Sequence, residues 1–486
     1  MGPDLVGPYC GTRDDVCCPS RDDECMVPIL DTSVTVTSSV IRHHLTVVLT
    51  TGVYVRTRNP LPPLQDTTFL ARWDEKVRRA NAIPSLSSSY LDIRYEAGCR
   101  KHGREYAGGD VIEDNCNTCT CAQEPLLGGV YNWKCTNHIC LIQPDLLRKI
   151  NDGQFGWKAG NYSSFWGKTL DDGIRYKLGT LPPDTAVMNM TAVQNDVFEV
   201  PPEEFDAREK WANYIHPVRD QGDCGASWAF STVAVAGDRL AIESSGLLSD
   251  VLSPQQLLSC NVASGQLGCD GGALDKAWWF IRKNGIVTEE CYPYSSGQSG
   301  QAGECLLTKG VSSVACVTNS SKTTLHATPS YRVANDEREI MVEILNNGPV
   351  QATFRVKEDF FMYKSGVYSY TGTSPDNLPD DMQHIYHSVR LVGWGVETQE
   401  DGTETKYWIA VNSWGESWGE DGSFRIRRGD DQTDIQEHVI GVHGDILAVL
   451  AAHPSEDIRD QGLYNIYNRK PVKIPVRIPK PRAISG

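Results

Sequence analysis

The sequence predicts an α+β fold for its larger part, with small disulfide-rich modules ahead of it. Apolar residues recur with helical spacing in 226–283, and alternating apolar runs typical of strands follow in 350–411. Cysteines cluster in short stretches before these elements. Helices followed by strands indicate a domain of two halves, whereas the clustered cysteines indicate modules whose folds depend on disulfides.

The length and composition indicate a large folded chain. Its 486 residues are enough for two or three domains, and 40% apolar residues with 12 tryptophans supply a large core. Acidic residues outnumber basic ones by 62 to 46, and the net charge of -16 does not suit the basic surface that nucleic acids require. The best apolar run, 45–55, is too short to cross a bilayer. We expect neither a nucleic-acid partner nor a membrane span.

The cysteines point to an oxidising compartment. All 16 fall into three groups with even counts, at 10–25, 99–140 and 224–316. Even, clustered cysteines are typical of disulfides in secreted proteins. Three Asn-x-Ser/Thr triplets, at Asn161, Asn189 and Asn319, are glycan acceptors in that compartment. Because 1–9 lacks the apolar segment of a signal peptide, we expect the natural start to lie upstream.

The first cysteine group, in 1–31, has Cys10 ahead of a Cys17-Cys18 pair and Cys25, and resembles the opening of a somatomedin B module. Residues 32–90 contain no cysteine to complete such a module. If every codon begins one base earlier, two strings in this stretch can encode the missing cysteine pattern, so we hypothesise a frame error there. The alternative is a genuine threonine-rich linker. In either case we assign 32–90 no fold.

The second cysteine group lies in 91–144, a stretch too short and too rich in glycine for a hydrophobic core. Its spacing resembles a von Willebrand factor type C module, a small fold of strands and loops held by disulfides. A zinc site is the alternative, because Cys116 and Cys119 have the Cys-x-x-Cys spacing of zinc ligands. The signs of secretion favour disulfides.

From 145 onward the chain has the pattern of an ordinary globular protein. A short helix is predicted at 146–150, and Pro-Pro pairs at 182 and 201 bracket a linker that suggests a domain boundary near 201. Helical periodicity spans 226–243, Ser253 followed by Pro254 begins a second helix, and 272–283 forms a third that ends at Asn284-Gly285. Strands are predicted at 350–356, 387–392 and 407–411.

Four blocks carry a specific resemblance to papain-type cysteine peptidases. They read Gln-Gly-Asp-Cys-Gly-Ala-Ser-Trp-Ala-Phe at 221–230, Gly-Cys-Asp-Gly-Gly at 268–272, His-Ser-Val-Arg-Leu-Val-Gly-Trp-Gly at 387–395 and Asn-Ser-Trp-Gly-Glu-Ser-Trp-Gly at 412–419. Residues 205–211 resemble the mature start of cathepsin B, and 145–200 resembles its propeptide. The resemblance implies a pro-segment in 145–200 followed by a papain-like domain in 201–450. By the same resemblance, this domain has a helical lobe and a barrel-like lobe.

By position, the resemblance assigns His387 as general base, Asn412 as the group that orients its imidazole, and Gln221 as an oxyanion donor. The nucleophile position, immediately before Trp228, holds Ser227 instead of cysteine. A serine hydroxyl is far less acidic than a thiol, and neutral Asn412 cannot support an imidazolium as a carboxylate does. We therefore expect the domain to be catalytically impaired.

The resemblance also implies structural roles. Cys224 matches a structural cysteine that pairs with Cys269, whereas Cys260, Cys291, Cys305 and Cys316 leave three possible pairings open. By analogy, Gly271, Gly272 and Trp414 line the peptide cleft. Taken singly, each retained site residue also suits a plain structural role, such as a core histidine or a turn-forming asparagine. His384 and His387 are too few to bind a metal, and we expect no metal and no cofactor.

The tail, 451–486, contains six basic residues and no acid from Arg469 onward, together with several prolines. We expect an extended segment that is either solvated or attracted to sulfated glycans.

The combination of modules resembles the tubulointerstitial nephritis antigen family. That resemblance implies a secreted basement-membrane glycoprotein that adheres to laminin, type IV collagen and cell-surface integrins. A weakly active or altered peptidase and a decoy that captures peptides or inhibitors are the alternatives.

Overall fold

The computed structural model describes 98–447, apart from short gaps at 125–129, 195–199, 263–264, 310–313, 319–320, 323, 373–385, 399–401 and 430–431, together with five strands between residues 25 and 95. The chain divides into two units, Met1–Asn137 and His138–Gly486. The pro-segment and the peptidase-like region, which we separated near 201, belong to the same unit. Residues 1–24 and the tail at 451–486 lie outside the described residues.

The first unit contains an antiparallel five-stranded sheet in the order β1-β2-β3-β4-β5. Its strands are Cys25–Pro28, Thr35–Ile41, His44–Leu49, Val53–Arg56 and Arg94–Tyr95. We assigned no fold to 32–90, and the structure describes β2, β3 and β4 within this stretch. Valine and threonine are frequent in these strands, and their branched side chains favour extended backbone.

The cysteine-rich module follows in the same unit. β6 (Gly98–Lys101) and β7 (Arg104–Ala107) form a hairpin, and β8 (Val111–Asp114), β9 (Asn117–Gln123) and β10 (Tyr131–Cys135) form a three-stranded sheet. Disulfides join Cys99 to Cys121 and Cys119 to Cys135. Because Cys116 is disulfide-bonded as well, the Cys116-x-x-Cys119 pair does not form the zinc site we had considered.

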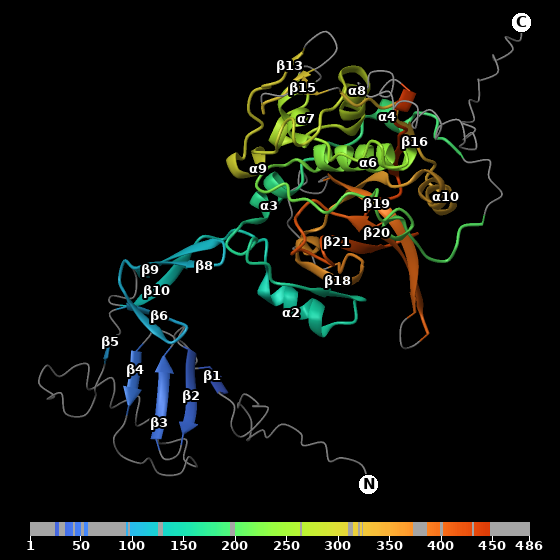
Figure 1. Ribbon diagram of the computed structural model, residues 1–486. Helices are drawn as coiled ribbons and strands as arrows, with labels where there is room; N and C mark the ends of the chain where they lie inside the picture. Colours follow the sequence, from blue (N-terminus) through green and yellow to red (C-terminus); the bar gives the residue numbers. More distant parts are fainter. Residues whose placement is uncertain are drawn as a thin grey trace, which may run out of the picture. The chain divides into compact units, whose positions relative to one another are not determined.

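The second unit has the α+β fold that the sequence predicted (Figure 1). Its helices are α2 (Pro144–Asp152), α3 (Leu170–Lys177), α4 (Thr185–Met188), α5 (Ala207–Lys210), α6 (Ser227–Glu243), α7 (Pro254–Cys260), α8 (Leu274–Asn284), α9 (Ser296–Ser299) and α10 (Glu337–Asn347), with the 3-10 turns η2 (Gly268–Asp270) and η3 (Glu358–Met362). Two predicted helix ends are found in the structure. Ser253 accepts a hydrogen bond from the Gln256 amide to cap α7, and Gly285 ends α8 with a φ of 74°.

A nine-stranded sheet runs in the order β11-β18-β21-β20-β19-β17-β22-β16, and β12 pairs with β19. The predicted strands are found within β17, β19 and β20. The sheet strands are β11 (Trp157–Ala159), β12 (Phe205–Asp206), β16 (Tyr331–Arg332), β17 (Val350–Arg355), β18 (Tyr363–Tyr368), β19 (Tyr386–Thr398), β20 (Glu404–Val411), β21 (Ser423–Arg427) and β22 (His438–Gly441). A small separate sheet contains β13 (Thr308–Lys309), β14 (Val314–Ala315) and β15 (Ser321–Lys322).

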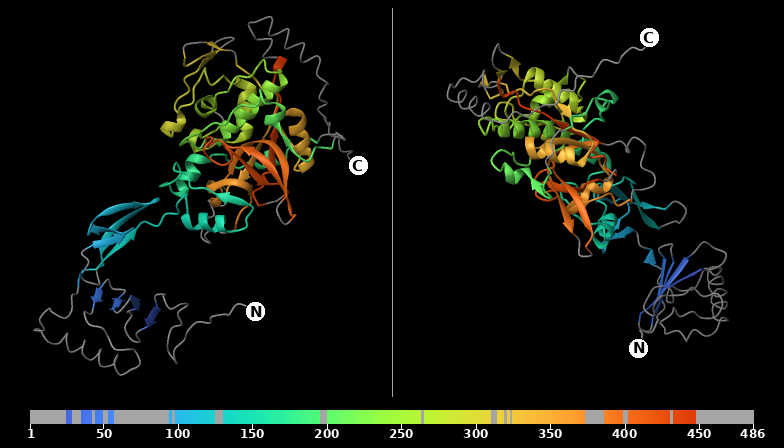
Figure 2. Two further views of the ribbon diagram at one scale, coloured as in Figure 1. Left: turned by 60° about the horizontal axis from the view of Figure 1, so that its bottom comes forward. Right: turned by 90° about the vertical axis from the view of Figure 1, so that its right-hand side faces the viewer.

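The two largest hydrophobic clusters correspond to two lobes. One lies among α6, α7 and α8, and the other lies against the strands. Figure 2 shows the green and yellow helices of the first lobe apart from the orange strands of the second. Pro-segment residues such as Leu146, Trp157 and Leu178 belong to the core of the sheet lobe. The pro-segment is therefore an integral part of this lobe.

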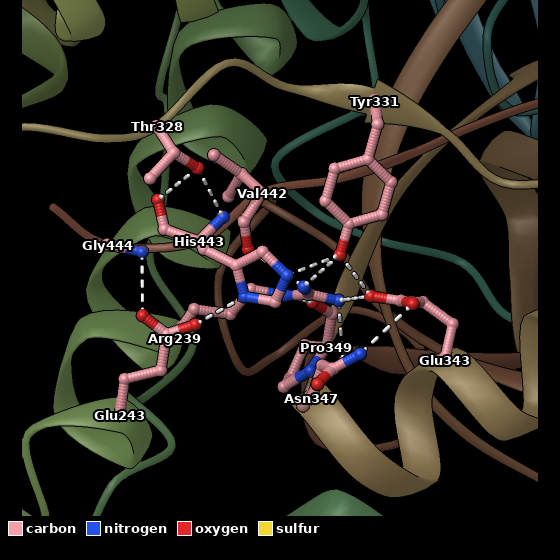
Figure 3. Close-up of polar contacts among 11 residues, drawn as sticks. Arg239, Glu243, Thr328, Tyr331, Glu343, Asn347, Pro349, Val442, His443 and Gly444 are labelled. Atoms are coloured by element: carbon pink, nitrogen blue, oxygen red, sulfur yellow. Dashed lines mark hydrogen bonds and ion pairs between the residues drawn. The ribbon is translucent and has the colours of Figure 1, made fainter. Parts of the chain in front are cut away.

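Buried charges join the end of α6 to the sheet lobe (Figure 3). Arg239 donates to Glu343 of α10 at 2.8 Å, and the Tyr331 hydroxyl donates to the same carboxylate oxygen at 2.6 Å. His443 Nδ1 lies 2.7 Å from Glu243 Oε1. Burial of Arg239 and Glu343 makes this ion pair a structural link between the lobes.

Candidate active site and its pro-segment

Ser227 is the first residue of α6 and is completely buried. The loop before it is held by the Cys224–Cys269 disulfide, the pairing that the resemblance implied. The Ser227 hydroxyl lies 2.8 Å from the hydroxyl of Thr180 in the pro-segment. The side chain at the nucleophile position is therefore engaged by another part of the same chain.

His387 lies near the start of β19, where it pairs with Phe354 of β17. Its Nε2–H donates to Asn412 Oδ1 at 2.7 Å, which leaves Nδ1 as the unprotonated nitrogen. Among the described residues, Nδ1 has no hydrogen-bond partner. Burial lowers the pKa of His387 to about 4, and the hydrogen bond to Asn412 opposes this shift. The imidazole is consequently neutral near pH 7.

Gln221 is fully buried beside these groups. Ser413 donates to its Oε1 at 2.6 Å, and its Nε2 donates to the Cys224 carbonyl at 2.8 Å and towards the Leu178 carbonyl at 3.4 Å. The Ser227 amide also donates to the Leu178 carbonyl, at 3.2 Å. Gln221, to which the resemblance assigns the role of oxyanion donor, and the backbone amide of Ser227 thus point at one carbonyl oxygen of the pro-segment.

The segment 177–181 contacts residues predicted to line the cleft on either side of that carbonyl. Trp414 Nε1 donates to the Lys177 carbonyl at 2.7 Å. The Gly272 amide donates to Gly179 at 2.9 Å, and the Leu181 amide donates back to Gly272 at 3.0 Å. Gly272 and Trp414, which we predicted to line the cleft, therefore hold the pro-segment by its backbone.

Two glycines permit this close approach. A Cβ atom on Gly272 would lie 2.4 Å from the indole of Trp228. Gly179 has a φ of 104°, and a Cβ atom there would lie 2.0 Å from the Gly225 carbonyl oxygen. Any larger residue at Gly179 would strain the backbone and push the pro-segment away from the loop before α6.

Sequence reasoning missed Thr180 and Ser388. The Thr180 hydroxyl donates to Ser388 Oγ at 2.9 Å, and Ser388 Oγ lies 2.7 Å from Ser231 Oγ. Ser388 is part of the block that begins at His387, but no local pattern connects it with Thr180, 208 positions earlier. The resemblance of 145–200 to a propeptide predicted a pro-segment there. It could not predict that Thr180 is the residue that contacts Ser227.

The other predicted residues fall outside this cluster. Asn161 and Asn189 are exposed, whereas Asn319 and His384 lie outside the described residues. Within the described ranges, no group of three or more potential metal ligands occurs. The sequence left three pairings of four cysteines open, and the structure pairs Cys260 with Cys305 and Cys291 with Cys316.

Comparisons with known proteins agree with this geometry. The model of the papain family of cysteine proteases matches residues 201–443. A tubulointerstitial nephritis antigen-like protein of Mus musculus is 46% identical over 361 residues, which cover 71% of this chain and 76% of that protein. The chain belongs to the tubulointerstitial nephritis antigen family. The tubulointerstitial nephritis antigen of Homo sapiens is 42% identical over 366 residues, covering 73% and 75% of the two chains.

Among solved structures, the procathepsin B S9 of Trypanosoma congolense aligns with a TM-score of 0.53 and 28% identity, covering 63% of this chain and 99% of that one. The expected papain-like α+β fold is thereby confirmed. In this member of the tubulointerstitial nephritis antigen family, Ser227 stands at the predicted nucleophile position, and residues 177–181 contact the predicted cleft residues Gly272 and Trp414.

Proposed function

We propose that this protein is a secreted basement-membrane glycoprotein whose papain-like domain does not cleave peptides. Its function is adhesion to matrix proteins such as laminin and type IV collagen and to cell-surface integrins. The observation that carries the proposal is the side chain at 227, a buried serine whose hydroxyl bonds to Thr180 of the pro-segment.

The electrostatics of the site support the lack of catalysis. A papain-type nucleophile needs a thiolate stabilised by an imidazolium, but Ser227 is a hydroxyl and the lowered pKa of His387 keeps its ring neutral. A serine nucleophile needs a carboxylate behind the histidine, and Asn412 occupies that position. In the described part of the chain, no hydrogen bond joins Ser227 Oγ to His387 Nδ1.

The filled cleft argues against the decoy alternative. A decoy requires an accessible groove, and residues 177–181 use the cleft donors Gly272, Trp414 and Ser227. Adhesive contacts are therefore expected on other surfaces.

The disulfides support secretion. The structure contains disulfides in both the small module and the papain-like domain, and two exposed asparagines occupy glycan-acceptor triplets. No helix in the described ranges is long and apolar enough to cross a membrane.

Two assays on the full chain test this proposal together. Solid-phase binding to purified laminin and type IV collagen should be saturable, and absence of binding to both would end the adhesion proposal. A fluorogenic peptide assay should give the same background rate for wild type and Ser227→Ala. Turnover that disappears in Ser227→Ala would identify a serine-type peptidase instead.

The supporting groups His387, Asn412 and Gln221 predict a further result. In Ser227→Cys with the pro-segment removed, the new thiol should react with iodoacetamide more rapidly than an ordinary exposed cysteine does, because the imidazole regains access to water and a proton. Because pro-segment side chains belong to the core of the sheet lobe, circular dichroism must show that the cleaved variant is folded; an unreactive thiol in the folded variant would mean that the remaining groups no longer support a nucleophile.

A further inference from the structure

Helix α8 presents an aromatic side chain between cations on its outer face. Two adjacent tryptophans take opposite environments there, because Trp278 is 1% exposed and donates to Gln351 at 2.6 Å, whereas Trp279 is 53% exposed. Lys276, Trp279 and Lys283 follow the spacing i, i+3, i+7, which places them along one stripe of a helix. The exposed Arg282 lies beside that stripe.

The charge of this stripe differs from that of the whole chain. Eleven residues of α8 contain three basic side chains and one acid, Asp275, in a chain whose net charge is -16. In the described part of the chain, Lys276, Arg282 and Lys283 form no ion pair with a carboxylate, unlike Arg175 and Arg219, which pair with Asp270 and Glu289. Their positive charge is therefore available to a ligand.

We propose that the outer face of α8, comprising Lys276, Trp279, Arg282 and Lys283, binds a sulfated polysaccharide. Exposed basic clusters attract polyanions, and an indole provides a flat apolar surface on which a sugar ring stacks through its C–H groups. From Lys276 to Lys283 the helix rises about 10 Å, comparable with the length of a disaccharide repeat. In the proposed complex, the indole of Trp279 stacks on a sugar ring, and the neighbouring lysine and arginine side chains contact the sulfate groups of the polysaccharide.

The cellular compartment favours sulfated glycans over nucleic acid as the polyanion. Nucleic acid has the same charge and also stacks on tryptophan. The papain-like domain holds three disulfides, Cys224–Cys269, Cys260–Cys305 and Cys291–Cys316, which are typical of the extracellular space, where sulfated glycans are abundant. The proposal goes beyond adhesion to proteins by naming a surface and a ligand class, and it does not depend on the state of the cleft.

The test is binding of the full chain to immobilised heparin, with the six basic residues from Arg469 onward changed to serine so that the tail does not contribute. Lys276→Ala/Arg282→Ala/Lys283→Ala should weaken binding about 30-fold and reduce the slope of log K against log salt by about two to three. Trp279→Ala should weaken binding about tenfold with an unchanged slope. Trp166→Ala, at another exposed tryptophan, is the matched control and should bind normally.

Any of four results would overturn the proposal. Two concern heparin itself: undiminished binding by the triple variant, or no binding once the tail is neutralised. The other two are binding to poly-glutamate as tight as to heparin, which would assign the surface to acidic proteins, and equally tight binding to desulfated heparin, which would assign it to stacking alone. Trp279, Arg282 and Lys283 are exposed and Lys276 is half-buried, so an unchanged thermal midpoint is required of each variant to show that it folds.

Discussion

Gly179→Ala tests directly whether the pro-segment seals the cleft. A methyl group at this position would overlap the Gly225 carbonyl oxygen, which lies 2.0 Å from the Cβ position, and backbone cannot rotate out of the way. The segment 177–181 must therefore leave the cleft or distort the loop before α6. Either response exposes the side chain at 227.

The size of the effect follows from the contacts. Among the hydrogen bonds that hold the segment, four short ones join its backbone to the rest of the domain, and only these four are counted: Trp414 to Lys177, Ser227 to Leu178, Gly272 to Gly179 and Leu181 to Gly272. At about 1 kcal/mol each, they keep the open state at roughly one molecule in a thousand. A strained alanine at positive φ costs about 3 kcal/mol, which raises the open population roughly a hundredfold.

The assay is the rate of iodoacetamide labelling in a Ser227→Cys background with the pro-segment intact, because a buried thiol reacts only from the open state. Gly179→Ala should label roughly a hundred times faster than the parent. Gly303→Ala is the control, since Gly303 also has a positive φ, 68°, but a Cβ atom there meets no neighbour within 4 Å. Equal labelling rates for the two alanine variants would refute the sealed cleft.

The remaining predictions concern protonation and buried charge. Burial lowers the pKa of His387 and His438 from 6.5 to about 4, so the unfolded chain binds protons in this window that the folded chain does not. Stability is full above pH 6.5 and should fall towards pH 4 by roughly 3 kcal/mol per histidine, partly opposed by Asp359, whose pKa burial raises to about 6. Urea unfolding across this window measures the change, and a net gain on acidification would contradict the prediction. Glu343→Gln leaves the buried guanidinium of Arg239 without its carboxylate, so it should lower the free energy of unfolding by about 3 to 5 kcal/mol in the same assay. Arg239→Met with Glu343→Leu should recover most of that loss, and wild-type stability of Glu343→Gln would count against a structural ion pair.

Features with a local pattern were predictable from the sequence. Helix α6 begins one residue after the predicted start, and Ser253 and Gly285 cap the next two helices as their residue types suggest. The site positions Gln221, His387 and Asn412 followed from motif blocks whose order along the chain resembles a known family. Such signals depend on neighbours in sequence, and tertiary packing did not override them.

Features that depend on distant partners were not predictable. Four cysteines allowed three pairings, and only their positions after folding join Cys260 to Cys305 and Cys291 to Cys316. Residues 32–90 were left without a fold because their sequence suggests a frame error or a linker, and the structure describes β2, β3 and β4 there.

By itself the sequence determined the atom at the nucleophile position, an oxygen in Ser227 where a papain-type peptidase needs sulfur. Only the tertiary structure decided what that oxygen meets, because Thr180 lies 47 residues earlier and reaches it through the path of the folded pro-segment. Residue identity sets the intrinsic acidity of this group, because a hydroxyl O–H is far less acidic than a thiol S–H. Contact depends on the course of the backbone, and no local pattern in the sequence records it.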